Sequence, residues 1–405
     1  MKYLDDDILI VSAARTPFGR FGGSLKNIDC YELGAMPIRE ILKRASIDPS
    51  MVDDIYWGMG DTSSCRDVYT PIAGRQSALK AGIPVTTPAC TIDKACVSGT
   101  SAIILGARSL KLGECSVALA GGATTFSQEP FILRGVRFEG HKMGNLTIED
   151  PLFGLGYKDY NPVAVDAGER ALVHKISREE QDEWAIRSHQ LYGDAYGKEK
   201  FKDEMVAVNY SHNPDKPEYL DIDEQYRKNI SLEKLSQLKT VFNSATVTAG
   251  NAPGMNDGSA AMILVKGKRA RELKIEPIAK IVSYRCVAGE TGHIPEIPAE
   301  ATIQALKIAD LSVKDIDLFE INEAFAVMPL VSTKILGEND PQAISKLREK
   351  TNVNGGAIAI GHANTATGVR LVMTLAYELR RRGGGRGVAA ICGGLGQGDA
   401  IVVEV

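Results

Sequence analysis

The chain has 405 residues, of which 44% are hydrophobic and 24% charged, as in ordinary soluble globular proteins. This length is enough for two or three domains with a sizeable core. The formal net charge of −4 does not indicate a nucleic-acid groove or an anionic membrane as partner.

The N-terminus and the cysteines bear on the compartment. Three acids stand at 5–7, where a signal peptide requires a basic start, and no apolar run reaches the length of a membrane span. The seven cysteines are scattered and odd in number, which does not indicate a disulfide framework. Cys90 and Cys96 lack zinc-ligand spacing. We therefore expect a cytoplasmic protein without a metal site.

Strands and helices alternate in the first part of the chain. The pattern predicts strand 8–12, helix 31–45, strand 52–58, a long apolar helix from Cys96 to a stop at Gly113, and strand 116–120 ending at Gly121-Gly122. This alternation is typical of parallel sheets in α/β proteins.

Charged and turn residues dominate from 126 to 243, which predicts an inserted subdomain of helices and loops. The α/β pattern returns at 246–251, 260–265 and 278–282. We therefore divide the chain into three parts: an N-terminal α/β half over 1–125, completed by 244–275; an inserted loop domain over 126–243; and a C-terminal α/β half over 276–405.

The chain also repeats itself. Residues 45–56 and residues 307–318 both run from a helix end through a break to a strand. The helix after Cys96 and its following Gly-Gly strand have a counterpart in the helix after His362 and the strand ending at Gly393-Gly394. If the two halves pack about a pseudo-twofold axis, the helix starts at Cys96 and His362 converge. Chance similarity between α/β units is the alternative.

Cys96 stands at the start of the first of these helices and is followed by small residues at 98–102, which allow a backbone or a substrate to come close. The positive end of the helix dipole is expected to lower the thiol pKa and favour the nucleophilic thiolate. Taken alone, the motif favours a small buried thiol instead, which free cysteines usually are.

Four blocks carry groups that can react together: Cys96-Val97-Ser98, Asn322-Glu323-Ala324-Phe325, Gly361-His362-Ala363 and Cys392-Gly393-Gly394. A thiolate nucleophile needs a base, which His362 can supply. An oxyanion forming on a thioester needs donors; Asn322, the His362 ring and the N–H groups of Cys96 and Gly394 are candidates. Cys392 suits a proton shuttle. The plainer alternatives are a histidine that only completes hydrogen bonds and a glycine-rich turn.

In this order, the four blocks resemble the Cys-x-Ser, Asn-Glu-Ala-Phe, Gly-His-Pro and Cys-x-Gly motifs of the thiolases. Residues 12–19, 249–252 and 352–359 match the family as well, so the resemblance covers nearly the whole chain. It implies the thiolase fold, an α/β fold with two similar halves in a five-layered αβαβα core and an inserted loop domain that holds coenzyme A. It also implies a homodimer or homotetramer, with coenzyme A and acyl-CoA as substrates and no tightly bound cofactor.

The resemblance also implies roles. Cys96 is the acylated nucleophile, and His362 activates it and helps bind the thioester oxygen. Asn322 positions a water for the same oxygen, and Cys392 moves the proton at the α-carbon of the second acyl group. Gly394 lends its N–H, with that of Cys96, to the acyl-enzyme oxygen. The implied reaction is reversible acyl transfer: Claisen condensation with acetyl-CoA, or thiolysis of 3-ketoacyl-CoA by CoA in fatty acid metabolism.

For coenzyme A, the resemblance points to four positions. Arg227 resembles the family's arginine at the adenine end, and Phe242 and Ala249 resemble residues along the pantetheine arm. Pro253 replaces a serine expected to face pantetheine, so a hydroxyl is missing there.

Three further departures concern the reaction centre. Ala363 follows His362 where the family usually has proline, so the turn is expected to be looser. The His-Met-Gly of short-chain members is missing, with Val163-Ala164 in the aligned region, and a second pocket methionine falls at Gly292. Because both pocket changes exchange bulk for space, we expect the pocket to admit acyl chains longer or bulkier than acetoacetyl.

The motifs also bear on two alternative functions. Another condensing enzyme of the same fold, such as a ketoacyl synthase or hydroxymethylglutaryl-CoA synthase, lacks a second cysteine at the position of Cys392 and the Asn-Glu-Ala-Phe block. A non-catalytic thiolase-like subunit would have lost at least one of Cys96, His362 and Cys392, and all three are present.

Overall fold

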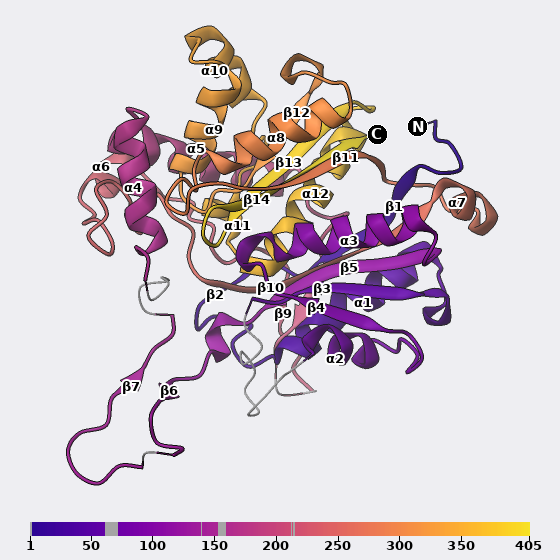
Figure 1. Cartoon of the computed structure of the whole chain (residues 1–405), viewed down its shortest axis with the longest axis horizontal. Coiled ribbons are helices and arrows are strands. Elements are labelled where there is room, and N and C mark those ends of the chain that lie inside the picture. Colours follow the sequence, from indigo (N-terminus) through magenta and orange to yellow (C-terminus); the bar gives the residue numbers. More distant parts are fainter. Residues whose placement is uncertain (1, 61–71, 139, 153–158, 212, 214) are drawn as a thin grey trace.

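The computed structural model describes residues 2–60, 72–138, 140–152, 159–211, 213 and 215–405. Ten strands of the described chain form one large sheet: β1 (Ile8–Arg15), β2 (Gly19–Arg20), β3 (Asp54–Gly58), β4 (Ala89–Ile92), β5 (Val117–Thr124), β10 (Asn256–Lys266), β11 (Ala279–Ala288), β12 (Leu318–Ile321), β13 (Arg386–Gly393) and β14 (Gln397–Glu404). Their order is β12-β13-β14-β11-β1-β10-β5-β3-β4, and the short β2 pairs with β10 (Figure 1).

The sheet consists of two halves with the same pattern. In the first half, β3 runs parallel to β5, and β10 is antiparallel to both β5 and β1. In the second half, β12 runs parallel to β13, and β14 is antiparallel to both β13 and β11. The halves meet where Ile8–Ile10 of β1 pair with β11. The repeat predicted from the sequence is therefore a repeat of topology.

Helices cover and separate these halves, so that the fold has five layers, αβαβα (Figure 1). The first sheet half is covered on one face by α1 (Cys30–Ala45) and α2 (Ala73–Lys80). Between the halves lie α3 (Ser98–Leu112) and α12 (Asn364–Arg381). The outer face of the second half is covered by α8 (Ile297–Ile308), against which α9 (Val327–Leu336) packs. This confirms the predicted fold class.

Glycines allow the two central helices to pack closely. A Cβ on Gly99 of α3 would lie 2.3 Å from the Thr365 carbonyl oxygen of α12, and one on Gly368 would lie 2.7 Å from the Thr100 nitrogen. A Cβ on Gly122 of β5 would also lie 2.5 Å from the Thr365 oxygen. Because only residues without a Cβ permit this approach, they hold the starts of the two helices together.

The remaining elements lie around this core. Most belong to the inserted segment: the 3-10 turn Phe126–Gln128, β6 (Ile132–Leu133), β7 (Ile148–Glu149), α4 (Val163–Val173), α5 (Arg178–Gly197), β8 (Val208–Asn209), β9 (Tyr219–Leu220) and α6 (Leu232–Ser236). The others are the 3-10 turns Pro49–Met51, Ala95–Val97 and Val313–Asp315, and the helices α7 (Gly267–Leu273), α10 (Pro341–Glu349) and α11 (Ala357–Ile360). The boundaries proposed at 125/126, 243/244 and 275/276 stay a prediction.

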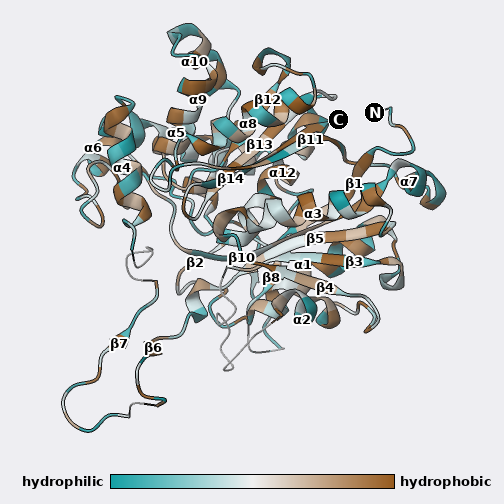
Figure 2. Cartoon of the chain, in the orientation of Figure 1, coloured by the Kyte–Doolittle hydropathy of each residue, from teal (hydrophilic) through white to brown (hydrophobic). Residues whose placement is uncertain are grey.

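Hydropathy follows the layers. In Figure 2 the strands of the sheet are mostly white to brown, whereas the outer helix α7 is mostly teal. β6 and β7 run out as an arm away from the core (Figure 1), and their side chains are half-buried or exposed. Within the described ranges, no helix combines the length and the apolar character that crossing a membrane requires.

Two local predictions differ from the structure. Residues 246–251 form turns instead of a strand, because side chains satisfy the backbone there: Thr248 N–H donates to Asn251 Oδ1 and Gly250 N–H to Thr248 Oγ1. Strand β5 does not end at Gly121-Gly122 but continues to Thr124, because these glycines make room for Trp57 and the start of α12.

Candidate active site

The two helix starts converge as the repeat predicts. Cys96 lies in the 3-10 turn that leads into α3, and His362 lies two residues before α12. The imidazole Nε2 of His362 is 3.3 Å from Cys96 Sγ, although 266 positions separate the two residues in the chain. The close packing of α3 on α12 at Gly99 and Thr365 is what brings these atoms together.

The turn that carries His362 is anchored from three sides. Its backbone N–H donates to Asn256 Oδ1 at 2.9 Å, and Asn256 Nδ2 donates to the Gly19 carbonyl oxygen at 2.9 Å. On the ring, Nδ1 lies 2.8 Å from Thr367 Oγ1. Gly361 adopts φ +112°, which residues with a Cβ rarely adopt. Asn256 and Thr367 could not be predicted from the sequence, because no motif spacing marks them.

Ala363, the residue that replaces the usual proline, is fully buried and has φ −80°. This angle lies within the range that proline itself adopts. The hydrogen bond to Asn256 and the glycine at 361 therefore define the turn without the pyrrolidine ring.

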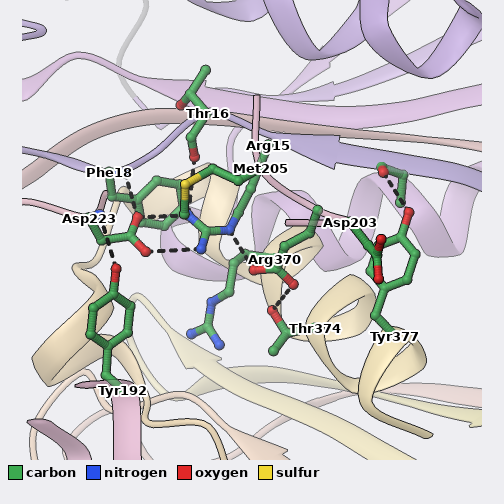
Figure 3. Close-up of polar contacts among 12 residues, drawn as sticks. Arg15, Thr16, Phe18, Tyr192, Asp203, Met205, Asp223, Arg370, Thr374 and Tyr377 are labelled. Atoms are coloured by element: carbon green, nitrogen blue, oxygen red, sulfur yellow. Dashed lines mark hydrogen bonds and ion pairs between the residues drawn. The ribbon is translucent and has the colours of Figure 1, made fainter. Parts of the chain in front are cut away.

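A network of buried ion pairs contacts α12 (Figure 3). Arg15 of β1 pairs with Glu204 at 2.8 Å and with Asp223 at 2.7 Å. Glu204 also accepts a hydrogen bond from Thr374 of α12 at 2.8 Å. Arg370, further toward the start of the same helix, pairs with Glu320 of β12 at 3.0 Å. These contacts tie the inserted segment and both halves of the sheet to the helix that carries His362.

Burial keeps both reacting groups uncharged. Burial, and to a lesser extent the Asp93 carboxylate, raise the pKa of the Cys96 thiol to about 12. Burial, and then the nearby Arg370 charge, lower the pKa of His362 to about 3. The expectation that the helix dipole lowers the Cys96 pKa is wrong, because desolvation of the thiolate outweighs it. The resting pair is a thiol and a neutral imidazole.

Cys96 and His362 open into a cavity of about 380 Å³ that Cys392, Gly394 and Pro253 also line. Most of the other wall is apolar: Met59, Phe126, Val163, Met255, Ile294, Phe325 and Met328. Cys392 is buried at the end of β13, 3.9 Å from the Met328 sulfur. Burial, and then the nearby Cys96, raise the pKa of the Cys392 thiol. Thus four of the five residues expected to react or bind oxygen face one space.

Asn322, the fifth, directly follows β12 and is fully buried. Its backbone N–H donates to the Ala390 carbonyl oxygen, but neither Oδ1 nor Nδ2 has a hydrogen-bond partner among the described residues. Ala324 and Phe325, which follow it closely, line the cavity. A buried amide with both polar atoms unsatisfied is suited to hold a water.

Glu323 belongs to the same sequence block as Asn322, but the motif alone indicates no role for it. Its buried carboxylate accepts hydrogen bonds from Trp184 and Ser188 of α5, from Asn352 Nδ2 and from the N–H of Ile358. These four donors come from the inserted segment and from the C-terminal half. Glu323 thereby fixes the loop that carries Asn322 against α5.

Of the four residues expected to bind coenzyme A, one lines the cavity and three lie at the surface. Pro253 lines the cavity, whereas Arg227, Phe242 and Ala249 are exposed. A bridge between Thr240 and Thr248 brings the segments of Phe242 and Ala249 together.

Of the two positions expected to widen the pocket, Val163 lines the cavity. Gly292 does not. It lies in a separate acidic pocket, where a Cβ would contact Asp166 at 3.5 Å. The residue from this segment that faces the cavity is Ile294. The prediction that Gly292 adds space beside Cys96 is therefore wrong.

Comparisons with known proteins agree with this geometry. The family model described as the thiolase N-terminal domain matches residues 8–268, and that of the thiolase C-terminal domain matches residues 275–405. The acetyl-CoA acetyltransferase of Cupriavidus necator is 39% identical over 98% of this chain and 99% of its own. A probable acetyl-CoA acetyltransferase of Mycolicibacterium smegmatis is 40% identical over 98% of this chain and 100% of its own.

Solved structures give the same result. The human mitochondrial 3-ketoacyl-CoA thiolase superposes with a TM-score of 0.92 at 37% identity, covering 99% of this chain and 100% of that one. The same human enzyme has also been solved in complex with CoA. The acetyl-CoA acetyltransferase of Bacillus anthracis superposes with a TM-score of 0.91 at 36% identity over the full length of both chains. These matches favour a thiolase over the other condensing enzymes considered above, and the chain belongs to the thiolase family.

Proposed function

We propose that the protein transfers acyl groups between a cysteine thioester on Cys96 and coenzyme A thioesters or free CoA. The observation that carries this proposal is the 3.3 Å contact of Cys96 Sγ with His362 Nε2, in a largely apolar cavity that also exposes Cys392. A nucleophile with a base beside it and a second thiol within the same space suits two successive proton and acyl transfers.

In the first step, Cys96 Sγ attacks the thioester carbonyl carbon while its proton passes to His362 Nε2. The resting pair is neutral, so the proton moves during attack and no thiolate has to form beforehand. The carbonyl oxygen then carries negative charge, which the protonated His362 ring and a water on Asn322 would stabilise. The C–S bond to CoA breaks, the proton returns to the departing sulfur, and Cys96 is left acylated.

In the second step of condensation, Cys392 first passes its thiol proton to His362 and then, as the thiolate, takes a proton from the α-carbon of acetyl-CoA. The carbanion attacks the carbonyl carbon of acyl-Cys96, whose oxygen would be held by the N–H groups of Cys96 and Gly394. The bond to Cys96 breaks, its sulfur takes back a proton from His362, and a 3-ketoacyl-CoA is released. In thiolysis the same steps run backwards, and the raised pKa of Cys392 suits it to return a proton to the α-carbon.

Coenzyme A would enter past Pro253, with its pantetheine arm along Phe242 and Ala249 and its adenine end near Arg227. The exposure of the last three residues and the bridge that brings the 242 and 249 segments together support a surface groove leading to the cavity. The acyl chain would lie against Val163, Ile294, Phe325 and Met328. The apolar character of this wall is an argument for the proposal that the pocket admits acyl groups longer or bulkier than acetoacetyl.

We further propose a homodimer or homotetramer that works in the cytoplasm in fatty acid metabolism. The likeness in sequence and fold to full-length thiolases supports the assembly and the metabolic role, and the scattered cysteines support a reducing compartment. Light scattering of the purified protein tests the assembly, and a monomer would contradict it.

The decisive experiment is a thiolysis assay with CoA across a series of 3-ketoacyl-CoA chain lengths, with Cys96→Ala as the blank. We expect activity in the wild type, none in the blank, and higher kcat/KM for the six- and eight-carbon substrates than for acetoacetyl-CoA. Full activity in the blank would reject Cys96 as the acylated residue. A preference for acetoacetyl-CoA would reject the longer chain while leaving the reaction type intact.

A further inference from the structure

The turn before Cys96 is joined to the far end of the chain by a charge pair. Lys94 Nζ lies 2.7 Å from Asp399 Oδ1, across 305 positions of sequence. Asp399 is fully buried on β14, whereas the side chain of Lys94 is 19% exposed. An ammonium group reaching inward to a buried carboxylate constrains the backbone that carries it, because removing either partner leaves the other uncompensated.

The second oxygen of Asp399 holds the helix that follows Cys96. Ser101 Oγ donates to Asp399 Oδ2 at 2.6 Å, and Thr100 Oγ1 lies 3.1 Å from the same oxygen. Asp399 therefore contacts the chain two residues before Cys96 and again four and five residues after it. One carboxylate thereby fixes both sides of the nucleophile.

The backbone between these contacts is strained. Ala95, the residue immediately before Cys96, has φ +49°, a left-handed conformation that residues with a Cβ adopt rarely. Such a conformation persists only when the surroundings enforce it. Here Ala95 N–H donates to Asp93 Oδ1, and Ser98 Oγ joins Lys94 N–H to the Ala95 carbonyl oxygen.

The β13–β14 turn packs closely against the same segment. A Cβ on Gly393 would lie 3.1 Å from the Val97 nitrogen and 3.2 Å from the Lys94 carbonyl oxygen. The strained turn is thus held between this turn on one side and the Lys94–Asp399 pair on the other. If the pair is broken, Ala95 is free to relax toward negative φ, and Cys96 Sγ then moves relative to His362 Nε2.

We propose that Lys94 and Asp399 are positioning residues for the acyl-transfer reaction: their ion pair holds the Ala95 turn in the conformation that aims Cys96 Sγ at His362 Nε2. Neither residue needs to touch the substrate for this role. The inference rests on the proposed function of Cys96 as the acylated residue. None of the sequence motifs that identify the reacting residues includes Asp399.

Lys280 provides a control on the same strand. Its side chain is also 19% exposed and pairs with a carboxylate of β14, Glu404, at 2.9 Å. Glu404 lies at the end of the strand opposite to the cavity, where β14 pairs with the start of β13. Lys280→Met therefore removes a lysine–carboxylate pair from the same strand far from Cys96, at a carboxylate that is 24% exposed and keeps Arg386 as a partner.

The experiment measures kcat and KM for Lys94→Met, Lys94→Arg, Asp399→Asn, the double variant Lys94→Met/Asp399→Asn and Lys280→Met, with thermal unfolding of each. We expect kcat of Lys94→Met and Asp399→Asn to fall on the order of tenfold to a hundredfold, since a displacement of about 1 Å has effects of this size. KM stays within about threefold, because the ground-state contacts remain. Lys94→Arg retains most of the activity, and Lys280→Met matches the wild type.

The double variant separates positioning from general destabilisation. If both residues act through one contact, its kcat equals that of the weaker single variant. A double variant whose loss is the product of the two single losses would overturn the proposal. So would a folded Lys94→Met protein with kcat within about twofold of the wild type, and this comparison still decides the matter if Asp399→Asn does not fold.

A second readout does not depend on the substrate. The rate at which iodoacetamide alkylates Cys96, followed by peptide mass spectrometry, should differ between Lys94→Met and the wild type, because movement of the Ala95 turn changes the surroundings that set the thiol pKa. The exposed Cys90 serves as the internal reference. An unchanged Cys96 rate would count against the proposal even if the wild type proved inactive on every thioester, an outcome that would reject the proposed function alone.

Discussion

The hydroxyl oxygen of Thr367 lies 2.8 Å from Nδ1 of His362, on the edge of the ring away from Cys96. A neutral imidazole carries one proton, and the position of its partners selects the nitrogen that holds it. For Nε2 to accept the proton of Cys96, Nδ1 must carry the hydrogen and donate it to Thr367 Oγ1. Thr367 Oγ1 can accept from Nδ1–H and so supports the tautomer in which His362 is a base toward the thiol.

Replacing Thr367 with valine is expected to lower kcat about tenfold, because one hydrogen bond worth about 1.5 kcal/mol no longer favours this tautomer. KM should change little, since no ground-state contact with the substrate is removed. Thr367→Ser keeps the hydroxyl and should retain most of the activity. Steady-state kinetics of both variants check this, and a Thr367→Val enzyme as fast as the wild type would argue against the assigned tautomer.

The neutral resting pair predicts the pH dependence of Cys96 alkylation. With the thiol pKa raised to about 12 and the His362 pKa lowered to about 3, almost no thiolate exists near neutrality. The thiolate is the nucleophile, and its fraction rises about tenfold per pH unit well below the pKa. The rate of inactivation by iodoacetamide should therefore climb steadily from about pH 6 to pH 9, without a plateau.

A different pH dependence would contradict the neutral resting pair. A preformed thiolate–imidazolium pair would give a rate that levels off between the two pKa values of the pair. A plateau near neutral pH in substrate-free enzyme would thus show that burial does not determine the pKa of the Cys96 thiol. Blocking with acetyl-CoA before alkylation confirms that the inactivation measured is that of the active-site thiol.

The reacting groups could be predicted from the sequence because each stands in a short motif at a helix start or a strand end. The repeat of helix, break and strand placed Cys96 and His362 at equivalent positions, and the structure joins them at 3.3 Å. The partners that hold these groups could not be predicted in this way. Asn256, Thr367 and Asp399 are ordinary polar residues whose roles depend on segments that meet only in the folded chain.

Two errors have the same origin. The resemblance to short-chain members predicts Gly292 at the position of a pocket methionine, but Ile294 is the residue of this segment that lines the cavity. The helix start alone predicts a lowered Cys96 pKa, whereas the shift depends on the protein that packs around the thiol. Local patterns identify a reactive group, but the surrounding fold determines its environment.

Proline at position 363 should be accepted by this chain. Ala363 has φ −80° and lies at the N-cap of α12, where a backbone N–H has no partner within the helix. Because proline restricts the unfolded chain, Ala363→Pro is expected to stabilise the protein by about 0.4–1 kcal/mol, with kcat within about twofold of the wild type.

Thermal or urea unfolding checks the gain, and a second proline in the same helix is the control. Ala376 is equally buried but lies inside α12, so Ala376→Pro should cost about 3 kcal/mol or more. A loss of stability in Ala363→Pro comparable to that of the control would mean that the turn at His362 cannot adopt the geometry of its proline-containing relatives.

Glu323 is the residue whose conservative replacement should be most damaging to the loop that carries Asn322. Its carboxylate accepts from Trp184 Nε1 at 2.9 Å, Ser188 Oγ at 2.8 Å and Asn352 Nδ2 at 2.8 Å. Gly356 makes room for it, since a Cβ there would lie 2.2 Å from the Glu323 carboxyl carbon. All the partners are donors, and both oxygens are used.

Glu323→Gln keeps the shape but turns one acceptor into an N–H₂ group that faces donors. We expect it to lower the free energy of unfolding by about 2–3 kcal/mol, because hydrogen bonds to a charged acceptor are lost and a buried donor is left unsatisfied. Urea unfolding measures this loss. The control is Glu149→Gln, at a carboxylate that pairs with Arg134 on the exposed arm and should change stability by less than about 0.5 kcal/mol. If the two substitutions have equally small effects, Glu323 does not fix α5 against the Asn322 loop, and the water proposed on Asn322 would need another means of support.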